Sequence, residues 1–147
     1  MAIFVHTLPK KSLLRLVFLF ALALLAIILI RGFVDRKPDL ETLEGRQAYL
    51  KELGWEIDPA SEAHKTVRIP ASLDGIIADY NEMQLEQGCD LSKHLGETCE
   101  QYNYTVTNYP DTSQTVLVTL YVQNNTLIAG DVHSTALDGF MQGLKRE

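Results

Sequence analysis

The feature that most limits what this chain can form is an unbroken apolar run near its amino end. Residues 13–30 read LLRLVFLFALALLAIILI, in which Arg15 is the one charged residue. A helix rises about 1.5 Å per residue, and crossing the hydrocarbon core of a bilayer takes roughly 17 to 25 residues. A helix that is apolar on every side must be buried on every side, and a domain formed by the rest of this chain is too small to enclose it. The run therefore predicts a transmembrane helix at 13–31, preceded by a cytoplasmic segment at 1–12.

A basic start followed by an apolar run is typical of both a cleaved secretory signal and an uncleaved signal anchor. The small-residue pattern ALA at 21–23 lies inside the run, and Arg31 and Gly32 at its end do not suit a signal peptidase. The only cysteines, Cys89 and Cys99, lie too far along the chain for a lipoprotein signal. An anchor is favoured, and cleavage stays the alternative.

Charge predicts the orientation of this segment. The first 31 residues carry four basic side chains and no acidic one, whereas the rest carries nine basic and nineteen acidic residues, a formal charge of −10. Basic residues favour the cytoplasmic side, so we expect a single-pass protein of the cell membrane with its amino end inside and its domain outside. An acidic domain repels phosphate backbones, so no nucleic-acid partner is expected.

The chain beyond the apolar run predicts a short linker at 32–39 and one domain at 40–147. Leucines at helical spacing from Leu43, followed by Gly54, predict a first helix, and the apolar positions of 72–87 predict a second. Short strands are expected at 55–57 and 65–70, and a longer alternating stretch at 97–110 predicts another strand. Alternating residues on both sides of Asn124-Asn125 predict a hairpin at 115–132.

A short helix at 135–144 is expected to complete the chain. Helices packed on an antiparallel run of strands make a two-layer α+β domain, which is the predicted fold class.

The region after the apolar run also carries short stretches in a consistent order: YLKELGWEI, RIP, DYNEMQ, CDLSKHLG, YNYTVTNYP, IAGDV and LDGFMQGL. With these stretches the region resembles a family of Gram-positive bacterial proteins, domain of unknown function 4830. The resemblance implies a small exported protein, often with an amino-terminal membrane segment or lipoprotein signal. It implies no activity.

Cys89 and Cys99 form a disulfide in one interpretation and stay unpaired thiols in the other, and the sequence leaves both open. Acidic neighbours such as Glu100 raise the pKa of a thiol, which disfavours nucleophilic cysteine chemistry. The spacing of the two cysteines around His94 matches no usual zinc finger, and no cofactor is expected.

Tyr102, Tyr104, Asn108 and Tyr109 are a possible recognition surface, because tyrosine provides a large contact area at low entropic cost. Tyrosines on strands more often pack half-buried within a sheet, and this second interpretation is kept beside the first.

Asp131 and His133, two residues apart with Asp138 close behind, look like a metal or acid–base site. The strand is expected to end near Val132, which leaves His133 alone. Thr135 and Asp138 have the spacing of a helix capping box, and Asp131 after Gly130 suits a turn. Gly130, Asp131, Thr135 and Asp138 are therefore predicted to form a structural corner between strand and helix.

The sequence thus favours a membrane-anchored extracytoplasmic interaction or structural module of the bacterial envelope, without catalysis. Its partner would be an envelope protein, a peptide or a small ligand. The alternative is a small hydrolase or metal-dependent enzyme that uses Asp131 and His133 with Asp138 or Glu100.

Overall fold

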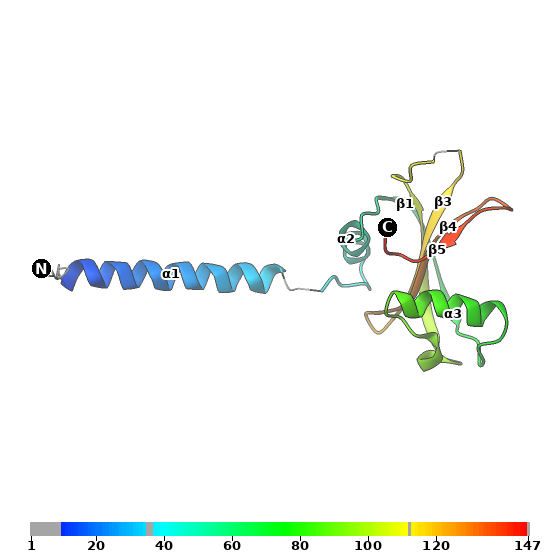
Figure 1. Ribbon diagram of the computed structural model, residues 1–147, viewed down its shortest axis with the longest axis horizontal. Coiled ribbons are helices and arrows are strands. Elements are labelled where there is room, and N and C mark those ends of the chain that lie inside the picture. The colour runs from blue at the N-terminus through cyan, green and yellow to red at the C-terminus, as the bar shows by residue number, and fades with distance from the viewer. Residues whose placement is uncertain (1–9, 35–36, 112, 147) are drawn as a thin grey trace, which may run out of the picture. The chain divides into compact units, whose positions relative to one another are not determined.

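The computed structural model describes residues 10–34, 37–111 and 113–146 (Figure 1). The chain divides into two compact units, Met1–Lys37 and Pro38–Glu147. Most of the predicted cytoplasmic segment 1–12 and part of the predicted linker 32–39 lie outside the described residues.

The first unit contains one helix, α1, Lys10–Val34. Its side chains are described for residues 15–28, and all of them are exposed, including Phe18 at 65% and Ile28 at 63%. Counting only the residues that the structure describes, no helix is long and apolar enough to cross a membrane.

The second unit is built on one antiparallel sheet whose strands follow one another in chain order. The strands are β1 (Ile57–Arg68), β2 (Thr98–Val106), β3 (Val116–Gln123), β4 (Thr126–Ser134) and β5 (Met141–Gln142). The predicted hairpin at 115–132 is confirmed as β3 and β4. Asn124 and Asn125 turn the chain with φ values of 48° and 60°, which asparagine tolerates better than most residues.

Helices pack on both faces of this sheet. On one face, Tyr104 and Val118 contact Leu50 of α2 (Leu43–Glu52) and the side chain of Trp55. We call this the Trp55 face. On the other, the Tyr80 face, α3 (Ile76–Glu86) and the short 3₁₀ helix η1 (Leu91–His94) cover Cys99, Tyr121 and Ala129. The α+β class is confirmed, but the domain has three layers and not the two that were predicted, because α2 and α3 lie on opposite faces (Figure 1).

The first predicted helix is confirmed as α2. Thr42 accepts a hydrogen bond from the Gly45 amide at its start, and Gly54 follows its end with a φ of 86°. This left-handed conformation costs glycine little, so Gly54 can stop the helix and send Trp55 toward the sheet.

Two other elements differ from prediction. The strands expected at 55–57 and 65–70 are one strand, β1, with an irregular register between Asp58 and Ala63. The second helix begins at Ile76 and not at residue 72. Ile76 is one of the apolar positions from which this helix was predicted, yet its side chain is 83% exposed.

The predicted helix at 135–144 is wrong. The chain turns back after Ser134 and forms β5, where the Ser134 amide donates to the Phe140 carbonyl at 3.0 Å. Leu137, Phe140, Met141 and Leu144 have helical spacing, but the edge of β4 offers hydrogen bonds that a local helix would leave unmade.

Candidate functional site

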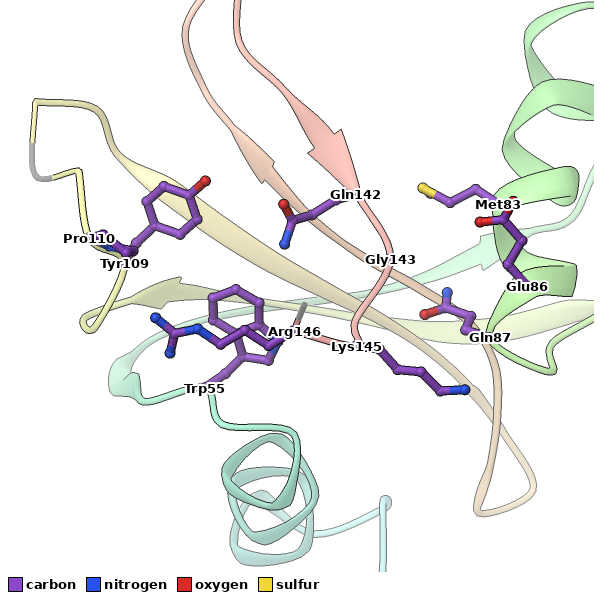
Figure 2. A pocket seen from close by; sticks show the side chains of 10 residues that line it. All are labelled: Trp55, Met83, Glu86, Gln87, Tyr109, Pro110, Gln142, Gly143, Lys145 and Arg146. Carbon is purple, nitrogen blue, oxygen red and sulfur yellow. The ribbon is translucent and has the colours of Figure 1, made fainter.

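A pocket of about 570 Å³ lies at the β5 end of the sheet, and we call it the edge pocket (Figure 2). Trp55, Tyr109 and Pro110 form one wall. Met83 and Glu86 of α3 form the other wall with Gln87, the residue that caps this helix. The C-terminal residues Gln142, Gly143, Lys145 and Arg146 run between the two walls. The pocket thus joins elements from both faces of the sheet around its last strand.

Stacked rings make the first wall. The Trp55 and Tyr109 ring centroids are 6.3 Å apart with an interplanar angle of 11°, and those of Tyr109 and Phe140 are 5.0 Å apart with an angle of 16°. The Trp55 Nε1–H donates to the Leu144 carbonyl at 2.6 Å, which fixes the indole against the C-terminal segment. The guanidinium of Arg146 lies 5.0 Å from the Trp55 ring centroid, within the range of a cation–π contact.

The second wall is fixed to the sheet by side-chain amides. The Gly130 amide of β4 donates to Gln84 Oε1 at 2.8 Å, and Gln87 Nε2 donates to the Gly130 carbonyl at 2.7 Å. The Leu144 amide donates to Gln87 Oε1 at 2.8 Å. Gln84 of α3 and Gln87, the residue that caps its end, therefore provide the hydrogen bonds of Gly130 at the edge of β4, beyond the end of β5. Buried backbone groups need such partners, so these residues are structural parts of the wall.

The edge pocket is locally cationic in an acidic unit. Residues 38–147 contain seven basic and eighteen acidic side chains, whereas the pocket is lined by two basic residues, Lys145 and Arg146, and one acidic residue, Glu86, a formal charge of 2 − 1 = +1. Arg146 donates to the carbonyls of Gly54 at 3.0 Å and Asn108 at 3.5 Å. Among the described residues, neither Lys145 nor Glu86 takes part in a salt bridge.

A second group of polar side chains lies on the Tyr80 face. The Tyr80 hydroxyl donates to Asp131 Oδ2 at 2.8 Å, and His133 Nδ1 donates to Asp131 Oδ1 at 2.7 Å. The Asp131 side chain is 4% exposed and that of His133 is 26% exposed. Because β4 continues to Ser134, Asp131 and His133 point the same way, and the expectation that His133 stands alone is wrong.

The electrostatics of this group follow from the buried carboxylate. The hydrogen bond to Asp131 raises the pKa of His133, and burial of the imidazole lowers it by a smaller amount. Burial, and then the charge of Asp131, raises the pKa of the Tyr80 phenol and brings that of Tyr121 to about 12. Both phenols therefore stay protonated, and Tyr80 acts as a hydrogen-bond donor and not as a base.

The structure does not bring the other proposed acids to this group. Glu100 pairs with His64 at 2.6 Å. It lies on the Trp55 face of β2, because Tyr102, two residues further along the same strand, belongs to that face. Asp138 has an exposed side chain in the turn between β4 and β5. In the part of the chain that the structure describes, no three histidine, cysteine or carboxylate side chains lie close enough to hold a metal ion.

The predicted corner is only partly correct. Gly130 adjoins α3, and a Cβ there would meet Leu144 Cδ1 at 2.6 Å, so close packing requires the glycine. Asp131 bonds side chains and not the turn amides that were expected. Thr135 donates to the Thr115 carbonyl at 3.3 Å, so with no helix to cap, the capping box with Asp138 does not form.

Two of the four residues of the predicted recognition surface are buried. Tyr102 is 8% exposed and Tyr104 is 0% exposed, because both face α2. The guanidinium of Arg46 lies 3.6 Å from the Tyr102 ring centroid, and its Nε donates to the Tyr104 hydroxyl at 2.5 Å. Ordinary sheet packing, the second interpretation, is correct for this pair.

The remaining two residues of that surface lie at the edge pocket or beside it. Tyr109 lines it, while Asn108 donates to the Gly54 carbonyl at 2.9 Å and accepts from the Glu56 amide at 3.1 Å. Asn108 therefore positions the loop that carries Trp55. Sequence reasoning missed Trp55, Gln87 and Arg146, although Trp55 is the only tryptophan of the chain.

Cys89 and Cys99 are both buried and are free thiols in the structure. Cys99 packs among apolar residues of the Tyr80 face, and burial raises the pKa of both thiols. Protonated, buried thiols are poor nucleophiles.

Comparison with known proteins places this arrangement in a family. No curated protein and no solved structure matches the chain. A family model described as domain of unknown function DUF4830 matches residues 49–132. The match contains Trp55, α3 and Tyr109 but ends before the C-terminal segment that runs through the pocket. Because it covers more than half of the sequence, the chain belongs to the DUF4830 family.

Proposed function

We propose that this protein is a membrane-anchored binding module of the bacterial envelope, with its amino end inside and its second unit outside. The module binds its partner in the edge pocket and performs no catalysis. The partner is an envelope protein, a peptide or a small ligand.

The edge pocket is the observation that carries this proposal. Its volume of about 570 Å³ lies in the usual range of ligand sites, roughly 300 to 1,000 Å³. It combines an aromatic wall with amide and charged groups, which is the mixture that fixes a ligand and orients it. Lys145 and Glu86 are free of salt bridges among the described residues, so their charges are available to a partner.

Anchoring is supported by the amino-terminal sequence. Residues 13–30 are apolar apart from Arg15, and the side chains described for 15–28 are exposed on every side of α1. Exposed apolar surface of this extent is unfavourable in water and favourable in a bilayer. The excess of basic residues before the apolar run supports the orientation.

One observation favours the enzyme alternative. His133 bonded to a buried aspartate resembles the orienting half of an acid–base pair, in which the second ring nitrogen would act on a substrate. Tyr80 is committed to Asp131 and does not extend the pair toward a nucleophile. We therefore assign the group to the stability of the β4 edge.

Photo-crosslinking in native membranes tests the binding proposal. A benzophenone amino acid at Gln142, inside the pocket, is expected to give a specific adduct in intact cells. The same amino acid at the exposed Lys65 of β1 is the matched control and should give none. Equal adducts from both positions, or none from Gln142, would show that the edge pocket is not the binding site.

A further inference from the structure

The last strand of the sheet leaves backbone groups unpaired beside the edge pocket. Ser134 and Phe140 form a hydrogen-bonded pair, so Val132 and Gln142 form the next one, two residues along. Met141 lies between these pairs, and in an antiparallel ladder its N–H and C=O must point away from β4. Gly143 lies two residues after Met141, so its backbone groups point in the same direction, and Gly143 lines the pocket.

The two edges of the sheet differ in how they are protected. β1 carries Pro59, an irregular register and the charged residues Asp58, Glu62 and Lys65, which all discourage pairing with another strand. The opposite edge, residues 140–143, reads FMQG and has neither charge nor proline. The short length of this edge limits nonspecific pairing with other strands, and the two walls of the pocket restrict which chains can approach the edge.

The pocket has the surroundings that an added strand requires. Gln142 points to the aromatic wall of Trp55 and Tyr109 (Figure 2), whereas a Cβ at Gly143 would meet Gln87 Oε1 of the other wall at 3.1 Å. Successive side chains of a strand laid beside β5 would alternate between the same two walls. Lys145 stands at the wall that also carries the acidic Glu86, and the Lys145 ammonium can pair with a carboxylate there.

We propose that the occupant of the edge pocket is an extended peptide, which adds to β5 as a sixth strand and places a carboxylate near Lys145. This inference rests on the proposed function and gives the class of its ligand. Backbone groups of Met141 and Gly143 provide the pairing, the two walls select side chains, and Lys145 selects an acidic or carboxy-terminal end.

The test uses the full chain purified in detergent micelles and a pool of hexapeptides randomised at every position. The immobilised protein is expected to enrich peptides with a free carboxyl terminus over their amidated forms. An exposed ion pair with Lys145 corresponds to about a two- to five-fold preference for the free carboxyl terminus over the amide. This preference should vanish in Lys145→Gln and persist in the control Lys65→Gln. Methylation of alternate backbone nitrogens in an enriched peptide should weaken binding about ten-fold.

Met141→Pro tests strand addition by changing the protein instead of the peptide. Proline removes the Met141 N–H that points away from β4 and leaves the pairing of Gln142 with Val132 intact. It should reduce peptide capture while the fluorescence of Trp55 still reports a folded domain. No enrichment from the pool overturns the peptide assignment, and the Gln142 photo-adduct then decides separately whether the pocket binds another class of ligand. Equal binding of methylated peptides overturns strand addition. Dimers that Met141→Pro abolishes would make a second copy of this chain the occupant and also overturn the proposal.

Discussion

The hydroxyl of Tyr80 in α3 donates a 2.8 Å hydrogen bond to the carboxylate of Asp131 in β4, joining residues 51 positions apart. Asp131 is 3% exposed, and its other recorded partner among the described residues is His133. Replacing Tyr80 by Phe leaves a buried carboxylate oxygen without its donor. We expect this to lower the free energy of unfolding by about 1 to 3 kcal/mol, measured by urea titration with Trp55 fluorescence.

Tyr121→Phe is the matched control for that change. Tyr121 lies on the same face, and its ring makes an edge contact with Tyr80 at 6.5 Å. Its hydroxyl makes no hydrogen bond among the described residues, so its removal should change stability by less than about 0.5 kcal/mol. Equal losses in both variants would mean that removing any hydroxyl from this face lowers the stability, and that the bond from Tyr80 to Asp131 makes no particular contribution.

His133 should make stability depend on pH. Its pKa in the folded state is raised above 6.5 by the hydrogen bond to Asp131. The added stability is therefore fully present below about pH 6.5 and is lost as the pH rises through the folded pKa. The difference in unfolding free energy between the wild-type protein and His133→Gln should be larger at about pH 5.5 than at pH 8.5, by about 1 kcal/mol. A difference that stays constant across this range would rule out protonation of His133 as its source.

Local signals in the sequence predicted the elements that local interactions form. Gly54 ends α2, and Asn124-Asn125 turns the hairpin, because each depends on backbone conformations available to those residues. The helix predicted at 135–144 failed because its helical spacing competes with pairing to β4, and spacing alone contains no information about that edge.

The candidate site was predictable only in part for the same reason. Tyr109 was proposed as a recognition residue and lines the edge pocket, but Trp55 and Arg146 lie 91 positions apart in the chain and meet only in the folded sheet. The pairing of Asp131 with His133 required that β4 continue to Ser134, two residues beyond the expected end.

Gln87 should control the rigidity of the C-terminal segment. It bonds Gly130 and Leu144 at once, so Gln87→Ala leaves a buried carbonyl and an amide without partners. We expect a loss of about 1 to 3 kcal/mol and faster hydrogen exchange at the Leu144 amide. Glu82→Ala, an exposed position on α3, the helix that Gln87 caps, should leave both quantities unchanged. Unaltered exchange in Gln87→Ala would show that Trp55 alone anchors the segment.

Thiol labelling of intact cells should report topology. Asp111→Cys is exposed and should react with a membrane-impermeant maleimide if the second unit is outside. The native Cys89 and Cys99 are 8% and 3% exposed and should stay unlabelled until the protein is denatured. If Asp111→Cys reacts only after cell lysis, the proposed orientation is reversed.

The central claim is that the protein acts through the edge pocket and not through the Asp131–His133 pair. It is tested most directly by the yield of the Gln142 photo-adduct in two further backgrounds, Tyr109→Ala and His133→Ala, each checked for folding by Trp55 fluorescence. Loss of a central aromatic contact should lower the yield about ten-fold in Tyr109→Ala. His133→Ala should retain the wild-type yield within about two-fold, the effect expected of a change outside the contact surface. Loss of the adduct in folded His133→Ala, with full yield in Tyr109→Ala, would contradict the account.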